Sequence, residues 1–94
     1  MDLEAFKKSL FLQEPPASIS VYIKALWYDG KGDWERAHQL IQDLNDKNAC
    51  WIHAYLHRKE GDSWNADYWY AKANRERPIF NLQTEWEQLC TALL

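Results

Sequence analysis

A pattern that recurs after 29 residues constrains this chain more than any other feature of its sequence. The dipeptide Gly32-Asp33 returns as Gly61-Asp62, and residues on both sides repeat in kind with the same displacement. The other matching positions are Ala25 and Ala54, Ala37 and Ala66, and the pairs Leu40-Ile41 and Trp69-Tyr70. A local pattern written twice predicts two copies of one supersecondary unit that stack against each other.

Each Gly-Asp predicts a tight turn between two helices. Glycine adopts the left-handed conformation that ends a helix, and the aspartate after it caps the free N–H groups of the next helix. We therefore predict an all-α fold of about six antiparallel helices in one domain. The two hairpins are placed at about 19–45 and 48–78, with capping helices at 2–12 and 82–93. A β-strand at 18–28 is the alternative that β-branched residues favour, but no partner strand is visible elsewhere.

The helix boundaries follow from capping residues and proline. Asp2 caps the first helix, in which Leu3, Phe6, Leu10 and Phe11 are expected to share one face, and Pro15-Pro16 ends it. Asn48 is the predicted cap of the fourth helix, and Asp62 or Ser63 opens the fifth.

Both hairpins resemble tetratricopeptide repeats. The second copy matches that pattern better, with Ala54, Gly61, Asp62, Ala66, Tyr70, Ala73 and Pro78. The first copy has Ala25, Tyr28, Gly32, Asp33, Ala37 and Ile41, but no closing proline, and the period of 29 is shorter than the 34 of the family. The second copy is also similar to segments of small bacterial proteins, a resemblance that brings no activity with it. The tetratricopeptide resemblance implies a non-catalytic module that binds a protein or peptide partner.

The same resemblance implies which residues would contact that partner. First-helix positions of such hairpins line a concave groove, and here they are Tyr22, Leu26, Trp51 and Tyr55, with Arg58 one turn further on as a partner for a carboxylate. The alternative is that the terminal helices fill the groove themselves. In that arrangement the first helix contributes Phe6 and Phe11, while the sixth covers Trp64 with Trp86.

Two further aromatic residues suggest a second interface. Trp64 and Tyr68 lie four residues apart on the fifth helix, outside its apolar stripe. Exposed aromatic patches usually mark interaction surfaces, so self-association into a homodimer is a further hypothesis.

His53 and His57 share one face of the fourth helix, a spacing that can chelate a metal ion. A third ligand is needed, and His38, Glu60 and Asp62 are the available residues. The zinc-hydrolase motif is absent because no glutamate follows His53. The interpretation that we favour from the sequence is that both histidines are hydrogen-bonded core residues and that no metal is bound, with a metal site as the alternative. A small metal-binding protein or metal-dependent enzyme therefore stands beside the interaction module as a hypothesis.

Composition narrows the remaining classes of function. The net charge of −3 argues against nucleic-acid binding, and no apolar run approaches the ~20 residues of a membrane span. The N-terminus is acidic and has no signal-peptide core, so a cytoplasmic protein is expected. Cys50 and Cys90 are expected as buried thiols rather than a disulfide. No nucleophile elbow or phosphate loop occurs, so neither an enzyme nor a cofactor is predicted.

Overall fold

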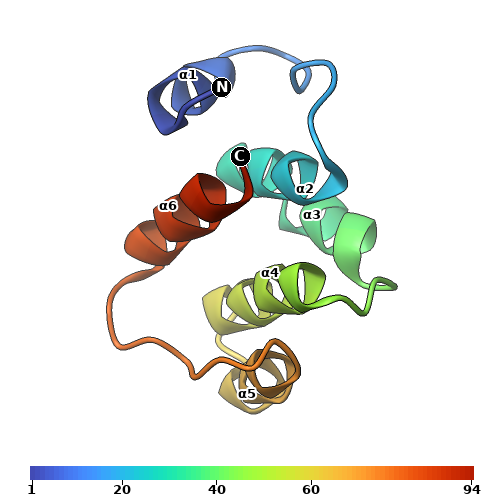
Figure 1. Ribbon diagram of the computed structural model, residues 1–94, viewed down its shortest axis with the longest axis vertical. Helices are drawn as coiled ribbons and strands as arrows, with labels where there is room; N and C mark the ends of the chain where they lie inside the picture. Colours follow the sequence, from blue (N-terminus) through green and yellow to red (C-terminus); the bar gives the residue numbers. More distant parts are fainter.

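The computed structural model of the chain describes residues 1–94, and it contains six helices and no strand (Figure 1). The helices are α1 (Leu3–Ser9), α2 (Val21–Gly30), α3 (Trp34–Ile41), α4 (Lys47–Lys59), α5 (Ser63–Lys72) and α6 (Leu82–Leu93). The all-α prediction with six helices is confirmed, and residues 18–28 form no strand.

The two Gly-Asp dipeptides form turns with the same backbone geometry. Gly32 has φ 87° and Gly61 has φ 88°, both in the left-handed region that glycine adopts without strain. In each turn the aspartate N–H donates to a carbonyl five residues earlier, at 2.9 Å for Asp33 and 3.0 Å for Asp62. Its side chain then caps the helix that follows. The sequence repeat is therefore also a repeat of local structure.

Polar residues cap all six helices at the N-terminus. Each cap side chain accepts a hydrogen bond from the backbone N–H three residues later, and the caps are Asp2, Ser20, Asp33, Asp46, Asp62 and Asn81. The prediction of Asn48 as the cap of α4 is wrong. Asp46 already accepts from the N–H of Ala49 at 3.2 Å, so the helix begins at Lys47, before Asn48 is reached.

The core forms where α6 packs across the two hairpins. The α2–α3 and α4–α5 hairpins stand side by side, and α6 contacts both α2 and α4 (Figure 1). Helix α1 in turn packs on α6. Twenty buried apolar residues make one continuous core, and free Cys50 and Cys90 belong to it. The sequence predicts that both terminal helices cover the hairpins, and in the structure α6 does most of this covering.

Helix α1 is shorter than the predicted 2–12 because its last turn tightens. The N–H groups of Leu10, Phe11 and Leu12 bond to carbonyls three residues back, whereas an α-helix uses the fourth residue back. Phe6 is fully buried and stacks on Trp86 at 5.8 Å between ring centroids, but Phe11 is 91% exposed. The expectation that Phe6 and Phe11 share a buried face is therefore wrong for Phe11.

Not one of the six helices has the length and apolar character needed to cross a membrane.

Candidate metal centre

All three histidines of the chain meet at one point between the two hairpins. His38 comes from α3, while His53 and His57 lie one turn apart on α4. The ring centroids are 4.8 Å apart for His38 and His53, 5.2 Å for His38 and His57, and 4.8 Å for His53 and His57. One nitrogen from each ring lies within 4.8 Å of the other two. Three imidazoles therefore face one another across two helices that are distant in sequence.

Of the three residues that the sequence offers as a third ligand, the structure places His38 beside both His53 and His57. Nε2 of His38 lies 3.0 Å from Nε2 of His53, a distance that one shared hydrogen accounts for. Four nitrogens bound tetrahedrally to zinc at 2.0–2.1 Å lie about 3.3 Å apart. The His38–His53 pair is already close to that separation. Glu60 and Asp62, the other two candidates, form a separate cluster with His57 that does not include His53.

Glu60 fixes the orientation of His57. Its Oε1 lies 2.7 Å from Nδ1 of His57. An ionised carboxylate only accepts hydrogen bonds, so Nδ1 carries a proton, and in the neutral form of the ring Nε2 presents a lone pair. The amide nitrogen of Asn65, 3.5 Å from that Nε2, agrees with this tautomer because an amide N–H donates. A histidine whose second nitrogen donates to a carboxylate is the usual arrangement behind a bound metal ion.

His53 is the most deeply buried of the three histidines, and its hydrogen bonding is incomplete. The residue is 4% exposed, and its Nδ1 has no hydrogen-bond partner. Trp69 stacks on its ring at 3.9 Å, and Trp34 stacks on the ring of His38 at 4.8 Å. His53 is thus buried and hydrogen-bonded through Nε2, as the sequence predicts, but its Nδ1 is left unpaired, and burying an unpaired polar nitrogen is costly.

The environment keeps two of the imidazoles uncharged at neutral pH. Burial, reinforced by repulsion from His38 and His57, lowers the pKa of His53 to about 3. Burial, followed by the repulsion of His57, also lowers the pKa of His38 below its ordinary value. A metal ion binds the neutral imidazole, so these two ligands need lose no proton near pH 7.

The predicted partner-binding groove is filled by α6. Leu26, Trp51 and Tyr55 are buried, with exposed fractions of 0%, 6% and 2%. Arg58 pairs with Glu85 of α6 at 2.8 Å, and Tyr22 bonds to Asp46 at 2.8 Å instead of standing free. In this structure the groove is thus closed to a peptide. The structure agrees better with the alternative in which a terminal helix occupies the groove. Trp64, however, is 81% exposed and is not covered by Trp86.

Sequence reasoning missed the residue that anchors α6 in this groove. Glu85 is 1% exposed and accepts hydrogen bonds from Tyr70, Arg58 and Trp51, three side chains of the second hairpin. The missed signal was its position, one residue before the buried Trp86 and three after Leu82, which places it beside the apolar stripe of α6.

Searches against protein-family models, curated protein sequences and solved structures found no match for this chain. Its function is therefore inferred from its own residues and their geometry.

Proposed function

We propose that this chain is a small, non-catalytic metal-binding protein in which His38, His53 and His57 hold one divalent ion of the zinc type. The observation that carries this proposal is the convergence of every histidine in the chain on one point. Imidazole nitrogen is a preferred ligand of zinc, and three imidazoles with one further ligand complete its tetrahedral shell.

The position of the site suggests what a bound ion would do to the fold. Helix α3 of the first hairpin supplies one ligand, and α4 of the second supplies two. An ion held by all three would join the hairpins where Trp34 and Trp69 already pack against the imidazoles. A ligand that binds only the folded chain stabilises it, by about 2.7 kcal/mol at a hundredfold excess over Kd.

Zinc titration of protein without a polyhistidine tag tests the proposal. After treatment with a chelator, calorimetry is expected to show one equivalent of zinc bound and a raised melting temperature. His38→Gln removes a half-buried ligand at the edge of the cluster, so it should leave the fold intact and weaken binding at least about tenfold. Zinc binding of equal strength in His38→Gln and the unaltered protein contradicts the proposal, as does the absence of saturable binding.

Two glutamate variants provide a matched comparison. Glu60→Gln removes the carboxylate that orients His57, and loss of such an outer partner typically costs 10–100-fold in metal affinity. Glu4→Gln changes an exposed glutamate of α1 that is not among the ligand clusters and should leave the affinity as it was. Equal effects of the two substitutions would point to general surface charge instead of a defined site.

Protein interaction through the outer face of α5 is the second candidate function. Trp64 and Tyr68 are 81% and 49% exposed, an unusual amount of aromatic surface for so small a domain. The same face on two copies can pack on itself around a twofold axis, so the occupant we favour is a second copy of this chain. Sedimentation velocity over a concentration range should then show a dimer that Tyr68→Ala weakens. A monomer at all concentrations rejects this candidate.

A further inference from the structure

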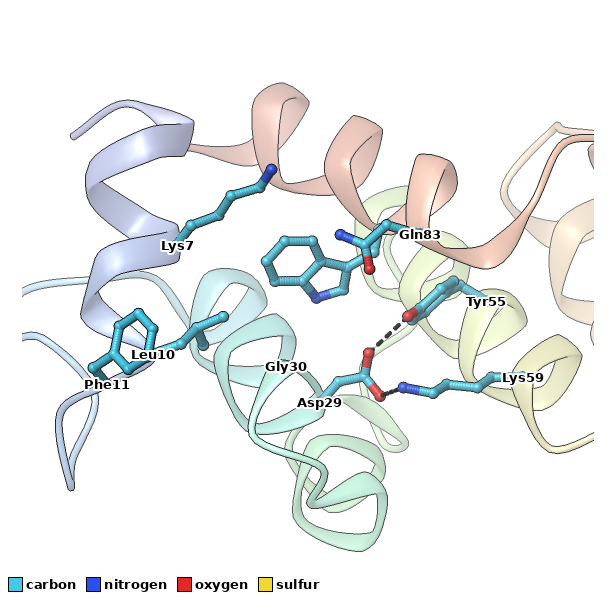
Figure 2. Close-up of a pocket in the computed structure, with 9 residues that line it drawn as sticks. Lys7, Leu10, Phe11, Asp29, Gly30, Tyr55, Lys59 and Gln83 are labelled. Atoms are coloured by element: carbon cyan, nitrogen blue, oxygen red, sulfur yellow. Dashed lines mark hydrogen bonds and ion pairs between the residues drawn. The ribbon is translucent and has the colours of Figure 1, made fainter.

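A pocket of about 430 Å³ opens where α1, α2, α4 and α6 meet, and none of its lining residues belongs to the histidine cluster (Figure 2). Its size lies within the range of about 300–1,000 Å³ that small-molecule sites occupy. Leu10, Phe11 and Trp86 give it an apolar lining, and Lys7, Lys59 and Gln83 add polar groups. Lys7 extends from α1, which also leads into Leu10 and Phe11, and Lys59 lies across the pocket on α4 (Figure 2). The pocket therefore combines an apolar lining with one ammonium group on each of two opposite sides.

The apolar lining is held in place although part of it is exposed. The ammonium of Lys31 donates to the carbonyls of Leu10 and Leu12 at 2.8 and 2.9 Å, which fixes the turn after α1 against the end of α2. Phe11 lies in this turn with its ring almost wholly in solvent. A fixed backbone beneath an exposed phenylalanine ring offers an apolar contact that the protein itself leaves unused.

The acid at the base of the pocket is already neutralised. Asp29 is 3% exposed, and its two oxygens accept from Lys59 at 2.9 Å and from the hydroxyl of Tyr55 at 2.7 Å (Figure 2). Its charge is therefore balanced by Lys59, which is itself partly exposed. An ammonium has three N–H donors, and Asp29 takes one of those of Lys59. The remaining donors are free to bind a second acceptor.

Donors also dominate the mouth of the pocket. Lys7 reaches across it from α1 (Figure 2) and pairs with Glu87 at 3.1 Å, with both side chains 35% exposed. Exposed pairs of this kind contribute little, so Lys7 can turn toward a ligand at small cost. Gln83, which donates to the same Glu87 at 3.0 Å, adds an amide N–H at the rim. An anion at the mouth would meet the ammonium of Lys7 and the amide of Gln83.

We propose that this pocket binds a small organic carboxylate with an apolar body, such as an aryl or alkyl acid. The carboxylate would pair with Lys7 at the mouth of the pocket, and the apolar body would lie along Leu10, Trp86 and the exposed ring of Phe11. A cation has no equal site here, because the carboxylate of Asp29 is buried and its charge is already balanced by Lys59. A ligand of this size has few contact atoms, so Kd on the order of 1 mM is expected.

Titration of ¹⁵N-labelled protein with 3-phenylpropionate tests the proposal. Saturable shifts are expected for the amides of residues 7–11 and 83–86, while the uncharged isostere 3-phenylpropanamide should bind at least fivefold more weakly. Binding of the amide or of 3-phenylpropylamine as tightly as the acid would overturn the proposal. So would shifts that rise linearly with concentration and never saturate.

Four surface variants separate a specific site from general attraction to lysines and apolar side chains. Lys7→Met removes the proposed cation and Phe11→Ala the exposed ring, and each should weaken 3-phenylpropionate binding about threefold to tenfold. The neighbours Lys8→Met and Leu12→Ala change exposed residues that do not line the pocket and should leave Kd unaltered. All four positions are at or near the surface, so the variants should fold. Equal Kd values in a variant and its neighbour control reject the site.

Discussion

Replacing Glu85 with alanine is expected to lower the free energy of unfolding by about 3–5 kcal/mol, because breaking a buried charge pair leaves its partner uncompensated. Glu85 accepts from the hydroxyl of Tyr70 at 2.8 and 2.6 Å, from Arg58 at 2.8 Å and from the indole of Trp51 at 3.3 Å. Alanine leaves Tyr70 and Trp51 without an acceptor beneath α6, and it leaves the Arg58 charge with only the carbonyl of Phe80 as a partner. A domain of this size has about 5–15 kcal/mol of stability in all, so the loss is a large part of it.

Urea denaturation of Glu85→Ala and Glu87→Ala measures this effect with a control on the same helix. Glu87 pairs with Lys7 at the surface, where both side chains are 35% exposed, so its removal should shift the midpoint far less. Tyr70→Phe removes one donor and keeps the acceptor, so an intermediate loss of about 1 kcal/mol is expected. Equal midpoints for Glu85→Ala and Glu87→Ala would mean that the buried network does not hold α6 in place.

The helices could be predicted because their signals are local. Gly32 and Gly61 end helices through their own backbone freedom, and Asp33 and Asp62 begin the next helices through their own side chains. These effects depend on residues a few positions apart, which a sequence displays directly. Periodicity alone places α6 at residues 82–93, the same bounds that the structure gives.

The end of α1 could not be predicted from the sequence, because a contact with a distant part of the chain accompanies it. Leu3, Phe6, Leu10 and Phe11 have helical spacing, so periodicity extends the helix to residue 12. The turn tightens after Ser9, where Lys31, from the end of α2, binds the carbonyls of Leu10 and Leu12. A contact between residues 19 and 21 positions apart leaves no local trace in the sequence.

The filling of the predicted groove by α6 also depends on contacts between residues distant in sequence. The apolar spacing of α2 and α4 is the same whether a partner or the chain itself covers these helices. Glu85 decides between the two, and it meets Tyr70, Arg58 and Trp51 only after the chain has returned from α5 to α6. A charged residue beside an apolar stripe usually faces water, so sequence reasoning places it at the surface.

Part of the histidine cluster is visible in the sequence. A spacing of four residues puts His53 and His57 on one face of any helix. His38 is one of three residues that could complete the set, and only the packing of α3 against α4 selects it over Glu60 and Asp62. Trp34 and Trp69 pack against the imidazoles and are half-buried. In the sequence, their helical spacing indicates only that they belong to the apolar stripes of α3 and α5, so their contact with the histidines could not be predicted.

In the metal-free protein, lowering the pH from 7 to 5 is expected to reduce the free energy of unfolding by about 2 kcal/mol through His53 alone. The folded-state pKa of His53 is about 3, below the ordinary value of 6.5. Below pH 6.5 the unfolded chain therefore binds a proton that the folded chain excludes, and stability falls with the pH. The lowered pKa of His38 acts in the same direction.

His53→Gln provides the comparison, because glutamine is of similar size and does not titrate. The titratable groups that face His53 remain in the variant: His38 on α3 and His57 on the same helix. Urea denaturation at pH 7, 6 and 5 in the presence of a chelator should give a shallower pH dependence for His53→Gln, whatever its absolute stability. Parallel curves for the two proteins would show that a buried, uncharged His53 is not what makes the fold sensitive to acid.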